Sequence, residues 1–337
     1  MKEPLTPKPM ENKFIGLAPL AGFSDRPFRS IAFDLGADFA VTEMVSIKGL
    51  FYKNRNTEEL LKTGKNEREV WIQVFGHEPE IFTRVIQEAL NPREDFYGID
   101  LNMGCPAPKI VKNGDGAALM KEPKRVEKLI KAMVEVSNKP ISVKMRLGFD
   151  HTCINFLEIG KICQEEGASR ITLHARTREA MYSGQANWDA IRKLKDALQI
   201  PVIGNGDVTC PEEARALFEL SGCDGIAIGR GAIGNPFLFG MIKEYLKKGF
   251  YENPGTSQIF SLLKRHYNLE VEERGEKRAL LVMRKEISRY LRGAHSSSHF
   301  VGLIHKAQSK DQVFLLLDQY QNFLEGKQSQ TSMTIRF

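Results

Sequence analysis

Short apolar stretches alternate with helical patterns along the first two-thirds of the chain. The stretches are rich in Val, Ile and Phe, and they cover residues 14–21, 39–44, 70–76, 97–105, 141–148, 170–176, 201–207 and 225–231. Segments with helical periodicity lie between them, at 27–35, 80–90, 126–136, 156–166, 188–197 and 212–220. Repetition of strand and helix predicts parallel strands joined by helical crossovers. The eight strands favour a closed (β/α)8 TIM barrel, an α/β fold, over an open doubly wound sheet.

The pattern changes at about residue 246, where the predicted strands stop. Residues 260–274, 277–292 and 311–324 have the periodicity of amphipathic helices. Pro254 and Gly255 mark the connection to them. We therefore expect an N-terminal tail (1–12), a barrel (13–245), a C-terminal all-α helical bundle (246–326) and a polar C-terminal tail (327–337).

Chemically unusual polar residues and one proline fall late in the predicted strands or directly after them. They are Pro19, Gln73, Asn102, Cys105, Lys144, His174, Arg176, Asn205, Asp207 and Arg230. The carboxyl ends of parallel barrel strands share one face, and barrel enzymes place their active sites there. The sequence therefore predicts a catalytic rim.

Composition narrows the picture only modestly. The chain of 337 residues holds 48 Lys and Arg against 42 Asp and Glu, so a net charge of +6 permits a polyanionic partner without requiring one. No apolar run reaches the length of a membrane-spanning helix, and the N-terminus lacks the apolar centre of a secretory signal. We expect a cytoplasmic protein with no membrane association. Five scattered cysteines without a CxxC pair argue against a disulfide framework and against a metal site.

Two glycine-containing loops suggest a phosphate site. Gly204, Asn205, Gly206 and Asp207 end the seventh predicted strand, and a Gly229-Arg230-Gly231 run ends the eighth. Glycines let backbone N–H groups approach an anion, and Arg230 can add a charge-assisted contact. The alternative is that these glycines only turn the chain.

Other rim residues suit the ring of a flavin. Lys144 stands among residues that should be buried, where a lysine needs a partner such as an anionic cofactor, although a lysine at a barrel end is more often a solvated charge. Gln73 can bond a ring edge or can be a satisfied core amide. The turn at Pro19, Leu20 and Ala21 can pack against the ring.

Cys105 is the candidate acid of the rim. It lies between Gly104 and Pro106, which restrict the loop, and a thiol that is protonated at neutral pH can donate a proton. His174 and Arg176 point the same way from one strand because side chains alternate. His174 can bond a flavin phosphate or a substrate, and Arg176 can hold a phosphate, a uracil edge or a structural ion-pair partner.

Several of these runs together resemble the tRNA-dihydrouridine synthases, most closely the bacterial B-type subgroup. The runs begin at Ala18 (APLAG), Asn102 (NMGCP), Lys112 (KNGDGAALM), Lys144 (KMR), His174 (HAR), Asn205 (NGD) and Gly229 (GRGA). The resemblance covers residues 14 to about 245 in order and is weak beyond. Leu20 departs from the pattern, since the family commonly has methionine there, but the two side chains are similar in volume.

The resemblance implies an enzyme that reduces uridine in tRNA with FMN as cofactor and NADPH as reductant. It implies hydride transfer from FMN to C6 of uracil and protonation of C5 by Cys105, with Asn102 and Arg176 facing the uracil. Carried over by position, the FMN-binding residues would be Pro19, Leu20, Ala21, Gln73, Lys144, His174, Asn205, Gly206, Asp207, Gly229 and Arg230. No obligate protein partner is implied.

The helical segment suits an RNA partner. Residues 246–326 hold 13 Lys and Arg against 9 Asp and Glu. Within 277–292, the basic residues Arg278, Lys285, Arg289 and Arg292 share one helical face, and the apolar residues Leu280, Met283, Ile287 and Leu291 share the opposite one. The basic face can track phosphates, or it can simply be solvated.

Two alternatives stay open from the sequence. A flavin barrel that acts on a small pyrimidine, like dihydroorotate dehydrogenase, would share the barrel chemistry but would not need the basic helical segment. A non-catalytic RNA-binding barrel would bind tRNA without a flavin.

Overall fold

A ring of parallel strands surrounded by helices forms the first compact unit of the chain. The computed structural model describes residues 10 and 12–326, so most of the expected N-terminal tail and all of the expected C-terminal tail lie outside the described residues. The strands are β1 (Phe14–Leu17), β2 (Phe39–Val41), β3 (Val45–Ser46), β4 (Val70–Phe75), β5 (Gly98–Met103), β6 (Ile141–Arg146), β7 (Arg170–His174), β8 (Val202–Asn205) and β9 (Gly225–Ile228).

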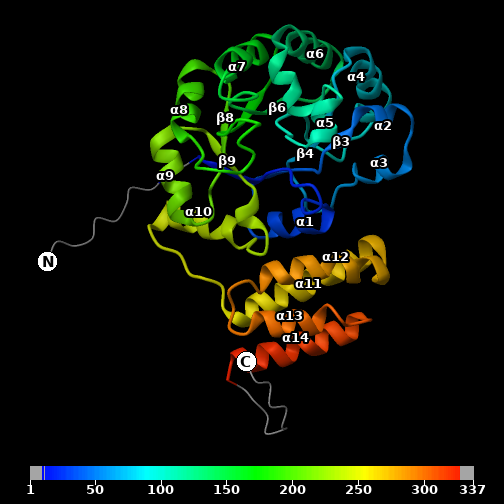
Figure 1. Ribbon diagram of the computed structural model, residues 1–337, viewed down its shortest axis with the longest axis vertical. Helices are drawn as coiled ribbons and strands as arrows, with labels where there is room; N and C mark the ends of the chain where they lie inside the picture. The colour runs from blue at the N-terminus through cyan, green and yellow to red at the C-terminus, as the bar shows by residue number, and fades with distance from the viewer. Residues whose placement is uncertain (1–9, 11, 327–337) are drawn as a thin grey trace, which may run out of the picture. The chain divides into compact units, whose positions relative to one another are not determined.

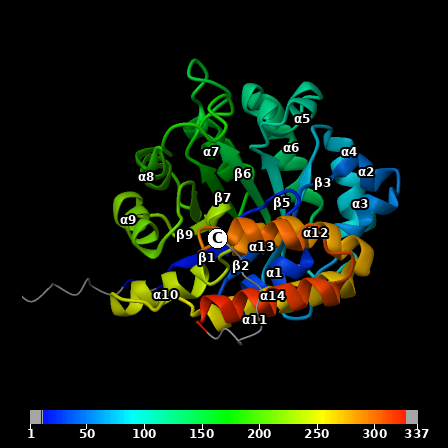
Figure 2. The ribbon, with the colours of Figure 1, turned by 60° about the horizontal axis from the view of Figure 1, so that its bottom comes forward.

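Parallel pairing closes these strands into a barrel. β1 pairs with both β2 and β9, and β2 pairs with β4, so eight strands form a continuous ring. The two-residue β3 adds to one edge of β4 and was not expected. The predicted TIM barrel is confirmed. Figure 2 shows the strands of the ring from a second direction.

Helices cover the outside of the ring, as Figure 1 shows. They are α1 (Arg26–Asp34), α2 (Ile47–Phe51), α3 (Arg55–Glu59), α4 (Pro79–Val85) with a π turn at Ile86–Leu90, α5 (Pro108–Lys112), α6 (Pro123–Val136), α7 (Phe156–Glu165), α8 (Trp188–Ala197), α9 (Pro211–Ser221) and α10 (Leu238–Lys248). Amphipathic α6 shows the principle: Val126, Leu129, Ile130 and Met133 are buried, while the lysines between them are exposed.

The second compact unit is helical. It contains α11 (Thr256–Arg274), α12 (Glu276–Tyr290), α13 (Ser297–Ile304) and α14 (Lys310–Leu324). The short helix α13 was not expected. The two units meet in the chain after Tyr251, and residues 232–237 belong with the helices while α10 belongs with the barrel. The boundary therefore differs from the expected position at 245, because α10 packs as the last covering helix of the barrel, beside α9 and β1.

The amino end of the barrel is closed by aromatic rings and a buried cation. The guanidinium carbon of Arg170 lies 3.8 Å from the ring centre of Trp71 and 4.4 Å from that of Phe39. Its Nη1 donates to Glu69 at 3.0 Å. Gly16 on β1 sits beside Phe39, where an added Cβ would come within 2.5 Å of the ring. This layer fills the barrel below the rim.

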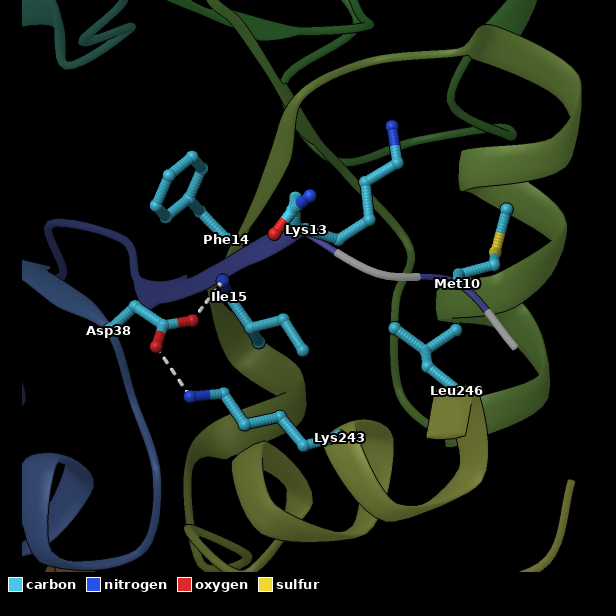
Figure 3. A pocket seen from close by; sticks show the side chains of 8 residues that line it. Met10, Lys13, Phe14, Ile15, Asp38, Lys243 and Leu246 are labelled. Carbon is cyan, nitrogen blue, oxygen red and sulfur yellow. Dashed lines mark hydrogen bonds and ion pairs between the residues drawn. The ribbon is translucent and has the colours of Figure 1, made fainter. Parts of the chain in front are cut away.

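A pocket opens on the outside of this amino end, as Figure 3 shows. Met10, Lys13, Phe14 and Leu246 line it. Its charged groups are used structurally, because Asp38 accepts from the backbone N–H of Ile15 at 2.9 Å and from the Lys243 ammonium. The pocket lies at the strand end opposite to the predicted rim.

Among residues 10 and 12–326, no helix combines the length and the hydrophobicity that crossing a lipid bilayer requires.

The contact of Gly16 with Phe39 predicts a stability effect. Gly16→Ala should lower the free energy of unfolding by about 1–3 kcal/mol, because the Phe39 ring must shift in a packed layer. Gly302→Ala in α13 is the matched control, since its Cβ would meet nothing within 4 Å and alanine favours a helix. Urea denaturation would measure both. Equal stability of Gly16→Ala and the parent protein would contradict this packing.

Candidate active site

Lys144 anchors one side of the barrel mouth. It lies on β6 opposite Asn102 of β5, and its Nζ donates to Asn205 Oδ1 at 3.1 Å. Asn205 is held in turn, because its Nδ2 donates to the Ala227 carbonyl at 2.6 Å. Burial lowers the pKa of Lys144 to about 8, and the nearby positive charge of Arg146 works in the same direction. A bound anion would restore the charged form.

The Cys105 loop is ordered by a side-chain amide. Asn102 Oδ1 accepts the backbone N–H groups of Gly104 at 3.1 Å and Cys105 at 2.9 Å. Cys105 is a partly exposed free thiol. A negative charge on its sulfur would act to raise the pKa of Lys144 and that of Arg146. The thiol therefore lies at the same end of the barrel as the lysine.

The amides of Gln73 and Asn102 bond to each other. Gln73 Oε1 accepts from Asn102 Nδ2 at 2.7 Å, and Gln73 Nε2 donates to the buried carboxylate of Asp100 at 2.7 Å. Gln73 thus has the bonding of a satisfied core amide, and Asn102 Nδ2 also makes a weak contact of 4.0 Å with Met44 Sδ.

The loops after β7, β8 and β9 lie close to one another and to several cations. Gly206 has φ +129°, and a Cβ there would lie 3.3 Å from the His174 ring and 3.7 Å from Arg176 Nη1. Gly231 approaches the Val208 carbonyl so closely that a Cβ would lie 2.2 Å from it. Both positions therefore require glycine because neighbouring atoms lie too close for a side chain, and not only because the chain turns there.

Two of the three guanidinium nitrogens of Arg176 are hydrogen-bonded, and the third is not. Its Nη2 donates to Asp207 Oδ2 at 2.6 Å and to the Gly184 carbonyl at 2.6 Å, and its Nε donates to Ser183. Although Arg176 is only 3% exposed, its Nη1 has no hydrogen-bond partner. A buried donor without a partner is costly, so this atom is available to a ligand bound at the barrel mouth.

The charges around these loops suit an anion. Burial and the surrounding positive charges of Lys144, Arg146, Arg176 and Arg230 lower the pKa of His174 far below its ordinary range, so the imidazole is neutral. Partial burial acts to raise the pKa of Asp207, but hydrogen bonds from Arg176 and Ala186 hold it below its ordinary value. One carboxylate thus faces several cations.

Nearly all of the predicted site residues meet at this mouth. Leu20 approaches Gly229, whose Cβ would lie 3.7 Å from the leucine side chain, and Arg230 Nη2 lies 3.6 Å from Asp207 Oδ1. Pro19 and Ala21 share the loop of Leu20, but no contact of theirs ties them to the other site residues.

The sequence reasoning assigned no role to Arg146, Tyr182 or Asp100. Arg146 Nε donates to the Gly104 carbonyl at 2.8 Å, and its Nη1 donates to the carbonyls of Thr177 and Met181, each at 2.8 Å. The exposed Tyr182 ring lies 4.5 Å from the Arg230 guanidinium carbon and 5.8 Å from that of Arg146. Alternation along β6 would have placed Arg146 beside Lys144, which is the signal that could have found it.

The comparisons with known proteins agree with this site. The family model described as dihydrouridine synthase (Dus) matches residues 16–326, through both units. A "Probable tRNA-dihydrouridine synthase" of Treponema pallidum is 35% identical over 292 residues, covering 84% of this chain and 86% of the relative. The "tRNA-dihydrouridine synthase B" of Vibrio cholerae is 34% identical, with 92% of this chain and 96% of the relative covered.

A solved structure supports the fold alone. Histamine dehydrogenase from Rhizobium sp. 4-9 is similar with a TM-score of 0.52 at 13% identity, covering 79% of this chain and 50% of that one. The family match runs to residue 326 and thus includes the helical unit, which the alternative of a small-pyrimidine barrel does not require. The barrel, its rim and these relatives together show that the chain belongs to the dihydrouridine synthase family.

Proposed function

We propose that this protein is an FMN-dependent tRNA-dihydrouridine synthase that uses NADPH and converts uridine to 5,6-dihydrouridine, with Cys105 as the proton donor. The observation that carries the proposal is the convergence of a thiol, a buried lysine and an unpartnered arginine donor at one barrel mouth. The names of the relatives supply the substrate class. A cytoplasmic location is part of the proposal because tRNA is its substrate.

The residues present fit the proposed cofactor. The loops of Gly206, Gly229 and Arg230, with the open Nη1 of Arg176, suit a phosphate group. Lys144 would hold the electron-rich side of the ring, and the 19–21 turn, Gln73, His174, Asn205 and Asp207 would complete the FMN site. When bound, FMN supplies the two-electron reduction of the uracil C5–C6 bond.

The chain's own residues then perform the proton step. Asn102 holds the backbone of the Cys105 loop, so the thiol is presented at a defined position. Cys105 would donate its proton to C5 of uracil, and the positive charges of Lys144 and Arg146 stabilise the thiolate that remains. Asn102, by exchanging its weak contact with Met44 Sδ for the base, and the Nη1 of Arg176 would orient the uracil.

The helical unit offers a surface for the tRNA backbone. Arg278, Lys285, Arg289 and Arg292 are all exposed, whereas Leu280, Met283, Ile287 and Leu291 on the opposite face are buried. Both expected faces are therefore present, although α12 ends at Tyr290, before the last residue of each face. We define these four cations as the basic stripe and propose that it contacts phosphates.

The role of Cys105 gives the central test. Cys105→Ala should purify yellow with bound FMN and be reduced by NADPH at the parent rate, yet lose at least about 100-fold in the reoxidation of the flavin by tRNA, because the general acid is missing. Rapid-mixing absorbance would measure both half-reactions. Cys153→Ala, which alters another partly exposed cysteine, is the control. A colourless parent protein would refute the proposal, and unchanged tRNA turnover in Cys105→Ala would refute this donor.

Lys144 should tune the electron affinity of the cofactor. Lys144→Gln removes a charge-assisted contact worth about 1.5–3 kcal/mol, so the two-electron midpoint potential of bound FMN should fall by about 30–60 mV. Redox titration with reference dyes would measure it. Lys13→Gln is the control, because Lys13 bonds the Cys223 carbonyl instead. Equal potentials in Lys144→Gln and the parent would contradict the assigned place of the lysine.

The basic stripe predicts a salt-dependent effect. Replacing Arg278, Arg289 and Arg292 together by Gln should weaken tRNA binding and reduce the slope of log Kd against log salt by about 2–3, roughly 0.7–0.9 for each phosphate that is no longer neutralised. Filter binding at several salt concentrations would measure the slope. The control replaces Lys124, Lys128 and Lys131, three exposed cations of α6. Equal slopes in both triple variants would exclude a specific role for the stripe.

A further inference from the structure

A buried carboxylate stands in the middle of the barrel without a role in the proposed chemistry. Asp100 lies on β5, two residues before Asn102, and is 1% exposed. Its Oδ1 accepts from Ser142 Oγ at 2.5 Å, and its Oδ2 accepts from Gln73 Nε2 at 2.7 Å. The pKa of Asp100 is raised above its ordinary value because the group is buried, and these two hydrogen bonds and the charges of Arg170 and Lys144 only partly oppose that rise.

A carboxylate dictates the orientation of an amide that faces it. Because Asp100 Oδ2 accepts, Gln73 must turn its Nε2 toward it and its Oε1 away. That Oε1 meets Asn102 at 2.7 Å, so Asn102 must offer its Nδ2 there. The remaining Asn102 Oδ1 then faces the loop and accepts from both Gly104 and Cys105.

The three side chains therefore form a one-way relay, which we define as Asp100, Gln73 and Asn102. The orientation of each side chain leaves the next side chain only one orientation in which the hydrogen bonds to both of its neighbours can form. The relay starts in the interior of the barrel and ends on the backbone N–H of the residue that carries the thiol. A buried ionic group costs solvation energy that a hydrophobic side chain would avoid, so its value here lies in specifying one arrangement.

We propose that Asp100 is a positioning residue for Cys105: its carboxylate sets the direction of the Gln73 and Asn102 amides and thereby holds the loop that presents the thiol. This inference rests on the proposed role of Cys105 as proton donor. It assigns to Asp100 no contact with substrate or cofactor.

An amide at position 100 would no longer impose one orientation on the Gln73 and Asn102 amides. In Asp100→Asn, the new Nδ2 can face Gln73 Oε1, which reverses Gln73 and then Asn102. The Asn102 Nδ2 would then face the N–H groups of Gly104 and Cys105, donor against donor, and the loop would lose its acceptor. The substitution preserves size, so packing in the barrel stays nearly unchanged.

The experiment compares Asp100→Asn with the parent holoenzyme at saturating FMN. The rate of Cys105 alkylation by iodoacetamide, read by peptide mass spectrometry, should change at least about threefold, and kcat for tRNA should fall at least about tenfold, since small misplacements of a reacting group are costly. KM for tRNA should stay within about twofold of the parent value, because the tRNA-binding surface is unaltered. An unchanged alkylation rate together with an unchanged kcat would overturn the proposal.

Asp38→Asn is the matched control. Asp38 is also a carboxylate that accepts from a backbone N–H and a side chain, but it lies at the amino end of the barrel beside Ile15 and Lys243 (Figure 3). Asp38→Asn should leave the alkylation of Cys105 and kcat at parent values. If both substitutions change alkylation equally, the effect is general destabilisation and the proposal fails.

An exchange of the carboxylate and the amide between positions 100 and 73 tests whether the orientation of the amides holds the loop. In the double variant Asp100→Asn with Gln73→Glu, the carboxylate at position 73 accepts from both amides, so Asn102 Oδ1 again faces the loop. Alkylation of Cys105 should return to within about twofold of the parent rate. This variant also decides the matter if Asp100→Asn does not fold: a restored rate supports the relay, and an altered rate overturns it.

The outcomes separate this inference from the proposed function. If the parent protein and Cys105→Ala reduce tRNA at the same rate, the proposed donor fails whatever the Asp100 variants do. If Cys105→Ala loses turnover as expected while Asp100→Asn behaves like the parent, only the relay fails.

Discussion

The interior of this barrel contains charged groups, and their hydrogen bonds govern the arrangement of the site. Asp100, Arg146 and Arg170 are each almost fully buried: Asp100 bonds to side chains of neighbouring strands, Arg146 bonds to loop carbonyls, and Arg170 bonds to Glu69 and lies against aromatic rings. Satisfying such groups demands a defined geometry, because an unpaired buried charge is far more costly than an imperfect apolar contact. The barrel therefore positions its rim through hydrogen bonds that run from its interior to its loops.

Positive charge dominates the mouth of the barrel, and this imbalance connects the fold to its chemistry. Four cations surround a neutral His174 and a single carboxylate, Asp207. The protein alone does not neutralise this charge, as the lowered pKa of Lys144 and the open Nη1 of Arg176 indicate. The proposed phosphate-bearing cofactor and the proposed polyanionic substrate would both supply negative charge here.

Much of the fold and the residue types of the site could be predicted from the sequence because their signals are local. Eight apolar runs define the barrel and place residues such as Lys144 at one face. The missed elements β3, α2, α3, α5 and α13 have at most eight residues, too few to show a period, whereas α10 was missed although it has 11 residues. The hydrogen-bond partners of these residues were not predictable. The orientation of Gln73 and Asn102 depends on Asp100, and the contact between Gln73 and Asp100 arises only when β4 and β5 are in register. Arg146 was missed because its guanidinium reaches loops 42 and 31 residues away, and such long-range hydrogen bonds have no local signature.

Arg146 also has a consequence for motion. One guanidinium holds the carbonyl that precedes the cysteine and two carbonyls of the segment that carries Tyr182. Both stretches are hydrogen-bonded to the same planar group, so neither can move outward without breaking its hydrogen bonds to the group that also holds the other stretch. The two loops therefore share one anchor, which links the position of the tyrosine to that of the thiol.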